Sequence, residues 1–338
     1  MSPGRRRAGS EWRAAASAHA ERAEALTAGR RERRSRGEKH PIDDFLYEYY
    51  SLTPALLRRW HPGVGVALEP DDDGAPPHAA WRWYRTAEDG AVSLDAHAFL
   101  ADRGDTVRYV HHLLSATAAR PAFAGCFGLH EWAMVYRQDE HRHALPLRLG
   151  QEGTDAVVEA HRLRCSHFDA FRFFTPDAVP RNATLLTRET QPALEQPGCL
   201  HATMDLLKWS LKLGPAVPGD LLLECAELAR DVRLLDMQAS PYDVSSLGEH
   251  AVAIETPEGK AEYVARQRGF AERAAPLRAR LVEVCAQLEG TAHPQRNTRA
   301  ASGTSTAAHP SETSSCSAGT PSPNQPSSSA WATAPSGT

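Results

Sequence analysis

Apolar residues recur at helical spacing through most of the chain. In residues 42–50 they fall at positions i, i+3, i+4, i+7 and i+8, which form one face of a helix. The same periodicity predicts further helices over residues 94–119, 129–137, 200–213, 220–237 and 257–287. Residues 11–29, rich in Ala, Glu and Arg, predict an exposed helix. The body of the protein is therefore expected to be mainly helical.

One segment shows the every-second-residue pattern of a strand in place of helical spacing. In residues 156–165 every second residue, from Val157 to Cys165, would point to the same side of a strand, and His167 and Asp169 would extend that side. Residues 60–79 break all periodicity with Pro, Gly and three consecutive Asp, which predicts a loop. The expected fold class is α+β, a predominantly helical single domain with a small sheet.

Changes of composition divide the chain into four parts. Residues 1–10 are expected to form a disordered basic lead, and residues 11–39 a helix followed by a basic linker. The main α+β domain should span residues 40–290. Residues 291–338 are dominated by Ser, Thr, Pro and Ala, cannot bury enough apolar surface to offset the entropy of ordering, and are expected to be a disordered tail.

Charge is distributed unevenly along these parts. Residues 1–39 hold eleven Lys and Arg against five Asp and Glu, whereas residues 40–290 hold 25 against 36. An acidic main domain is a poor match for duplex nucleic acid, so any DNA contact would need a local basic patch or the run RRERRSRGEK, which otherwise forms a solvated linker. No apolar run approaches the roughly 20 residues of a membrane span, and the N-terminus lacks the apolar region of a signal peptide. A cytoplasmic protein with no membrane partner is expected.

Six cysteines are scattered without a CxxC pair, which argues against a zinc ribbon or a disulfide framework. Cys225 and Cys285 lie in helical apolar patterns and are predicted to pack in the core. Cys165 lies two residues from His167, and the pair is a candidate for a nucleophile and its base, although no nucleophile motif accompanies it.

Four short segments place histidine beside a carboxylate among aromatic and apolar residues. They read HPIDDFLYEYY (residues 40–50), GLHEWAMVYR (128–137), RCSHFDAFRFFTP (164–176) and CLHATMDLLKWS (199–210). Burying ionisable groups is costly unless they pair with one another, a metal or a ligand. These segments therefore predict a polar pocket.

A metal site is one interpretation of that pocket, because imidazole and carboxylate together suit zinc, iron or manganese. The candidate ligands are His130, His167, Asp169, His201 and Asp205, with Glu131 beside them. HEWAM has the first His and the Glu of HExxH, but Met134 stands where the second His would be, so the zincin motif is incomplete. The alternative is that these histidines hold the fold through hydrogen bonds to carboxylates.

A glycosyl-bond interpretation uses the same residues. Removing a damaged base requires a carboxylate that orients water or stabilises positive charge on the sugar, and aromatic walls that stack the extruded base. The catalytic candidates are Glu131, Asp169 and His167. The substrate-binding candidates are Trp132 and Phe168 as pocket walls, Arg172 and Lys208 as phosphate ligands, and Asp44.

The four segments, together with the later RDVRLLDMQASPYD and IETPEGKAEYVARQR, resemble an actinobacterial family labelled 3-methyladenine DNA glycosylase, over roughly residues 12–287. The resemblance implies base-excision repair of damaged DNA by an N-glycosylase that acts on alkylated purine. Residues 62–65, PGVG, are similar in sequence to the hairpin with which helix-hairpin-helix glycosylases bind DNA phosphate. However, residues 67–77 form an acidic, proline-rich segment where those enzymes have a helix. The paired Cys and His ligands of zinc-containing glycosylases have no counterpart here, so no catalytic residue is carried over.

Three functions therefore stay open. The first is the glycosylase, with Glu131 or Asp169 activating water. The second is a metal-dependent hydrolase or oxygenase that acts on a small metabolite, which the acidic body favours because a small substrate needs no phosphate-gripping surface. The third is a non-enzymatic binding module whose His and Asp side chains only hold the fold.

Overall fold

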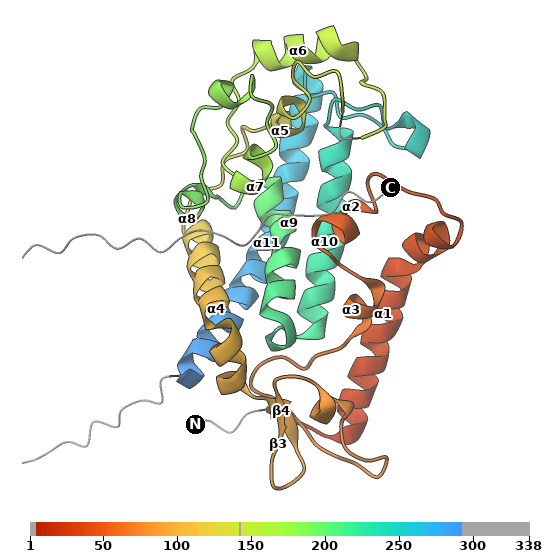
Figure 1. Cartoon of the computed structure of the whole chain (residues 1–338), viewed down its shortest axis with the longest axis vertical. Helices are drawn as coiled ribbons and strands as arrows, with labels where there is room; N and C mark the ends of the chain where they lie inside the picture. The colour runs from red at the N-terminus through yellow and green to blue at the C-terminus, as the bar shows by residue number, and fades with distance from the viewer. Residues whose placement is uncertain (1–4, 142, 293–338) are drawn as a thin grey trace, which may run out of the picture. The chain divides into compact units, whose positions relative to one another are not determined.

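Four helices form the centre of the structure, a computed structural model that describes residues 5–141 and 143–292 (Figure 1). They are α4 (Ala96–Ala118), α9 (Leu200–Leu213), α10 (Gly219–Gln238) and α11 (Pro257–Ala292). Helices α9 and α10 pack along each other, and α11 contacts α4, α9 and α10. The four helices predicted over these segments are confirmed, and the bounds of α9 agree with the prediction.

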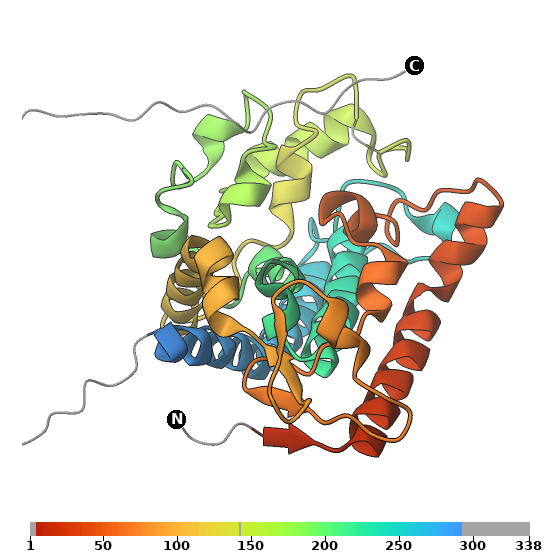
Figure 2. The ribbon, with the colours of Figure 1, turned by 60° about the horizontal axis from the view of Figure 1, so that its bottom comes forward.

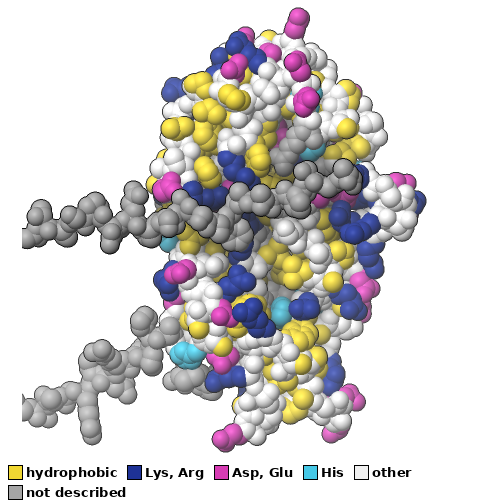
Figure 3. All heavy atoms as spheres, viewed as in Figure 1, with side chains coloured by type: hydrophobic (Ala, Val, Ile, Leu, Met, Phe, Trp, Pro, Cys, Tyr) yellow, Lys and Arg dark blue, Asp and Glu magenta, His cyan; other side chains and the backbone are white. Residues whose placement is uncertain are grey.

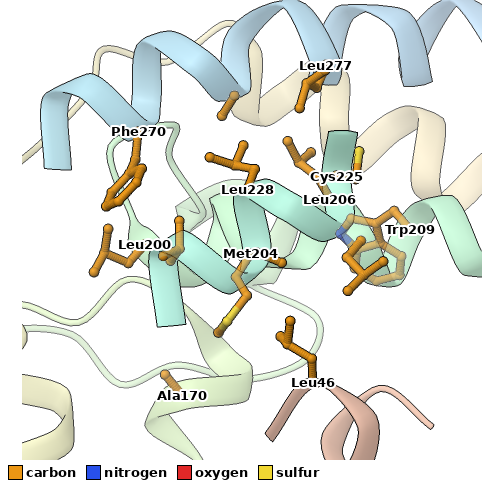
Figure 4. Close-up of a cluster of buried hydrophobic side chains, with 14 of the residues drawn as sticks. Leu46, Ala170, Leu200, Met204, Leu206, Trp209, Cys225, Leu228, Phe270 and Leu277 are labelled. Atoms are coloured by element: carbon orange, nitrogen blue, oxygen red, sulfur yellow. The ribbon is translucent and has the colours of Figure 1, made fainter. Parts of the chain in front are cut away.

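The core lies where α9 faces its neighbours. Met204 and Leu206 are fully buried on opposite sides of α9, and Leu228 of α10 and Phe270 of α11 close over it (Figure 4). Cys225 and Cys285 are buried among these apolar side chains, as predicted. Because α9 is covered on nearly every side, each polar residue that it carries must find a partner inside the protein.

Helix α1 (Gly9–Ser35) runs beside α3 (Pro54–Arg58) and α10. It continues through most of the basic run, so the expected linker is wrong for residues 30–35. The reason is that two of the arginines are paired: Arg30 Nη1 lies 2.7 Å from Asp44 Oδ1, and Arg33 Nη1 lies 3.0 Å from Asp43 Oδ2. These ion pairs attach the end of α1 to the segment that follows.

Four short strands form a mixed sheet beside the start of α4, seen from below in Figure 2. The order is β1 (Arg5–Arg7), β2 (Val66–Leu68), β4 (Val92–Leu94) and β3 (Tyr84–Thr86). β1 pairs in parallel with β2, with Arg6 opposite Ala67, and the other neighbours are antiparallel. The α+β class is confirmed, but residues 5–10 are not a disordered lead, and the loop predicted over 60–79 contains β2 and the 3-10 turn η1 (Pro77–Ala80).

The predicted strand over residues 156–165 is wrong. Residues 150–160 form helix α6 (Gly150–Ala160), which buries Thr154, Val157 and Val158 on one face. The spacings of three and four residues between these buried positions are helical. The alternating sequence pattern also included Glu159, but its carboxylate faces outward and pairs with Arg137. After α6 the chain is extended, and only Leu163 makes a bridge, to Asn182.

The remaining elements are short. They are α2 (Phe45–Tyr49), α5 (Leu129–Ala133), α7 (Phe168–Phe171), α8 (Gln191–Leu194), η2 (Val179–Arg181), η3 (Gly214–Ala216) and η4 (Ser245–Leu247). Helices α2 and α5 are shorter than predicted. In the PGVG segment, a Cβ on Gly63 would lie 2.7 Å from Pro218, so this turn packs against the start of α10.

The predictions about the C-terminal tail and about membrane spans can be compared with the structure only over the residues that it describes. The chain divides into units 1–294 and 295–338, and nearly all of the tail predicted over 291–338 lies outside the residues that the structure describes. Over 5–141 and 143–292, no helix is both long and apolar enough for a membrane span.

Candidate functional site

Two adjoining groups of buried ionisable side chains lie around α9. We call the first the inner cluster, which consists of His130, Glu131, His201, Arg233 and Asp236. We call the second the outer cluster, which consists of His167, Asp169, Glu195, Asp205 and Lys208. The clusters meet at α9: the ring centres of His201 and His130 are 4.5 Å apart, and those of His201 and His167 are 5.3 Å apart.

A sharp turn positions the first two residues of the inner cluster. Phe127 and Gly128 both have positive φ, 51° and 73°, immediately before α5 begins. A Cβ on Gly128 would approach the Cβ of Ala239 to 3.2 Å, so glycine serves both the backbone conformation and close packing against the end of α10. The turn brings His130 and Glu131 to α10, where the strained Phe127 backbone is held by the surrounding structure.

The inner cluster is enclosed and closely connected. Its residues are at most 7% exposed. His130 Nε2 lies 2.8 Å from Asp236 Oδ1, and Arg233 Nη1 donates to both Glu131 Oε1 (3.0 Å) and Asp236 Oδ2 (2.7 Å). One imidazole or carboxylate atom from each of His130, Glu131, His201 and Asp236 lies within 4.8 Å of all the others. Two histidines and two carboxylates therefore converge on one point.

Protonation follows from these contacts. Burial opposes the charged form of His130, but the Asp236 carboxylate outweighs burial and raises the pKa of His130. Burial tends to raise the pKa of Asp236, and the positive charges of His130 and Arg233 overcome it and hold that pKa well below its usual range. Two cations thus balance the two carboxylates, although burial and the Asp236 charge raise the pKa of Glu131.

His201 differs from the other members of the inner cluster. Burial, followed by the charge of His130, lowers the pKa of His201 to about 3, so this imidazole is neutral at physiological pH. Its Nδ1 is buried without a hydrogen-bond partner among the described residues. A neutral, unpartnered imidazole nitrogen is the form in which histidine ligates metals.

The outer cluster lies one turn further along α9. His201 and Asp205 are four residues apart and share a helix face, so α9 contributes one residue to each cluster. Asp205 is 1% exposed, accepts a hydrogen bond from the Tyr50 hydroxyl (2.7 Å), and is paired with Lys208 Nζ at 3.1 Å. Burial raises the pKa of Asp205, but Lys208 and His167 outweigh it and depress that pKa strongly.

Three cations surround Asp169. Lys208 Nζ lies 2.5 Å from its Oδ2, Arg188 Nη2 2.7 Å from its Oδ1, and Arg172 Nε 3.4 Å from its Oδ1. Burial favours the neutral acid, yet Lys208 and Arg188 lower the pKa of Asp169, which is ionised at neutral pH. Arg172 and Arg188 are 44% and 48% exposed at their side chains, so this part of the outer cluster reaches the surface.

His167 joins the outer cluster from the residue that precedes α7. Its Nε2 lies 3.5 Å from Glu195 Oε2 and 3.4 Å from Asp205 Oδ2, and neither of its ring nitrogens has a hydrogen bond to the described residues. Burial lowers its pKa, but the two carboxylates outweigh burial and raise it. His167 is held by electrostatic attraction to both carboxylates.

The other predicted site residues take no part in the ion pairs of the two clusters. Trp132 is fully buried and donates its indole N–H to Ala239 O, so its ring packs in the core. Phe168 carries the Arg188 guanidinium over its ring at 4.6 Å. Asp44 pairs with Arg30 at the end of α1. Cys165 is buried, which raises the pKa of its thiol and makes it a poor nucleophile.

Sequence reasoning missed Arg233, Asp236 and Glu195. The first two lie three residues apart in the apolar stretch VRLLDM, so the rule that identified the four segments, ionisable residues among apolar ones, would also have found them. Glu195 lies in PALEQPG, where no apolar pattern marks it. Its burial is known only once the loop after α8 is placed.

Comparisons with protein-family models, with curated proteins and with solved structures give no significant match. The resemblance to the glycosylase family therefore stays a prediction, and arguments about function rest on the two clusters.

Proposed function

We propose that the chain is a metal-dependent enzyme acting on a small molecule, a hydrolase or an oxygenase, with the metal in the inner cluster. The observation that carries the proposal is the convergence of His130, Glu131, His201 and Asp236 on one point. Two imidazoles and two carboxylates form a donor set that suits zinc, iron or manganese.

The residues present fit such an ion. Arg233 Nη1 contacts Oε1 of Glu131 and Oδ2 of Asp236, so Glu131 Oε2 has no bond from Arg233. Asp236 Oδ1, which lies 2.8 Å from His130 Nε2, would become a ligand once His130 has released its proton. His201 offers a neutral imidazole, and His130 would release its proton on binding. The bound ion would act as a Lewis acid, while Arg233 holds both carboxylates in place.

Metal content is the direct test. Protein purified without chelator is expected to hold about one equivalent of zinc, iron or manganese, measured by elemental analysis, and His201→Ala is expected to lose it. Thr203→Ala, a buried substitution on the same helix, is the matched control and should keep the metal. An active protein free of metal would reject this proposal.

A second candidate, the N-glycosylase acting on alkylated purine, is supported by the surroundings of Asp169. This ionised carboxylate lies beneath Arg172 and Arg188, whose guanidinium groups cover the rings of Phe173 and Phe168 at 4.1 and 4.6 Å. Cations and aromatic rings together suit a base and its phosphate. However, acidic and basic side chains are interspersed on the face shown in Figure 3, where a DNA-binding surface would be mainly basic.

Base release distinguishes the two candidates. If the chain is a glycosylase, the wild type should release alkylated purine from methylated DNA, and Asp169→Asn should reduce the rate by about a hundredfold or more, the size expected for a catalytic acid or base. Glu131→Gln tests the other carboxylate. Absence of base release by the wild type at every salt concentration would remove this candidate.

A further inference from the structure

The guanidinium of Arg233 has an edge with no carboxylate on it. Nη1 serves Glu131 and Asp236, whereas Nε has no hydrogen-bond partner among the described residues, and Nη2 meets only His143 Nε2 (3.2 Å) and Met237 Sδ (2.9 Å). Arg233 is 1% exposed. A buried guanidinium normally uses all of its donors, so the free Nε and the weakly occupied Nη2 require an explanation.

The same edge is found both with and without a partner elsewhere in the protein: Nε and Nη2 of the buried Arg278 also lack a hydrogen-bond partner among the described residues. The Nε–Nη2 edge holds both oxygens of a carboxylate in three pairs: Arg13 with Asp71, Arg22 with Glu227, and Arg36 with Glu38. This two-bond arrangement is the geometry in which arginine recognises carboxylates best. At Arg233 the same edge is directed away from Glu131 and Asp236.

A surface pocket of about 550 Å³ is lined by two of the side chains that contact the guanidinium. Phe45, whose ring centre is 4.0 Å from Arg233 Cζ, and His143, which contacts Nη2, both line that pocket. Tyr49, stacked on Phe45 at 5.1 Å between ring centres, continues the wall. The polar lining also includes Lys39, His40, Asp44 and Glu48. The pocket and the Arg233 guanidinium therefore share Phe45 and His143 as neighbours.

We propose that this pocket binds a small aromatic or apolar carboxylate, whose two oxygens take the Nε–Nη2 edge of Arg233 in place of His143. The carboxylate end would then lie next to the inner cluster, and the apolar part against Phe45 and Tyr49. The assignment of this molecule as the substrate class rests on the proposed function, whereas the anion site itself rests on Arg233 and the pocket.

Charge links the anion to the metal. A divalent ion in the inner cluster would add positive charge beside the Arg233 guanidinium, and a bound carboxylate would neutralise part of that charge. The anion should therefore bind the metal-loaded protein more tightly than the metal-free protein, and the coupling is reciprocal.

Calorimetric titration of the whole chain with benzoate and with benzamide, its neutral isostere, tests the inference. Benzoate is expected to bind at least about tenfold more tightly than benzamide. Arg233→Lys keeps the positive charge but removes the two parallel N–H donors of the guanidinium edge, so it should abolish that preference. Arg230→Lys, one turn earlier on α10, is the matched control and should preserve it. Equal affinity for benzoate and benzamide, or an unchanged preference in Arg233→Lys, would overturn the inference.

Different results would reject the metal-dependent enzyme and the anion site at Arg233. Benzoate binding by a protein that holds no metal would retain the anion site and reject the metal-dependent enzyme. One equivalent of metal without any preference for benzoate would retain the enzyme and reject the anion site. If Arg233→Lys does not fold, Phe45→Ala, which removes the pocket wall and leaves the ion pairs, should weaken benzoate binding. An unchanged affinity in Phe45→Ala would also overturn the inference.

Discussion

Replacing Asp205 by alanine is expected to lower the free energy of unfolding by about 3–5 kcal/mol, the usual cost of breaking a buried ion pair by removing one partner. Asp205 is 1% exposed and faces Lys208, His167 and the Tyr50 hydroxyl. Without it, an ammonium and a hydroxyl would remain in the core with too few acceptors. Urea unfolding at pH 7 measures the change.

Asp105→Ala is the matched control. The Asp105 side chain is 98% exposed and pairs only with the neighbouring Arg108, so its loss should change stability by no more than about 0.5 kcal/mol. A change of similar size in both variants would show that Asp205 contributes no more than a surface carboxylate does.

The effect of Asp205 should depend on pH with a definite sign. Because its folded-state pKa lies well below the ordinary value of 3.8, the unfolded chain binds the proton more readily. Its contribution is therefore complete above about pH 4 and is lost as the pH falls towards the folded-state pKa. The difference in stability between the wild type and Asp205→Asn should shrink by up to about 1.4 kcal/mol per pH unit below pH 4.

Adding the preferred metal is expected to raise the free energy of unfolding by about 4 kcal/mol when the free ion reaches a thousand times its dissociation constant. The reason is that the inner cluster exists only in the folded state. Thermal unfolding with zinc, ferrous iron or manganese, each reversed by a chelator, measures the gain and identifies the ion.

His201→Ala separates metal binding from structural support. His201 is the inner-cluster member without an ion pair in the structure, and its imidazole is neutral, so the metal-free variant loses mainly packing. The metal-dependent gain should disappear in His201→Ala and persist in Thr203→Ala. A gain that survives in His201→Ala would place the ion elsewhere.

The long helices could be predicted from sequence because their apolar stripes are uninterrupted, as in residues 200–213. The sheet could not. Arg5, Arg6 and Arg7 carry no strand pattern, and they form β1 because β2, about sixty residues later, offers an edge. Residues 156–160 show the reverse case, in which an alternating pattern is overridden by the burial of Val157 and Val158 on a helix.

Most members of the candidate site could be predicted from the sequence, but Arg233, Asp236 and Glu195 were missed, and the division into two clusters could not be predicted. The rule about ionisable residues among apolar ones identified His130, Glu131, His201 and Asp205. It gave no means of seeing that His130 would meet Asp236, 106 residues further along the chain. Which residues pair depends on how α5, α9 and α10 pack, and no local pattern contains that information.

The four-residue spacing of His201 and Asp205 has a mechanical consequence. A rigid helix turn connects the two clusters, so a shift of α9 that tightens contacts around one of them necessarily moves the side chain delivered to the other. A metal ion that moved α9 at His201 would therefore also move Asp205 in the outer cluster.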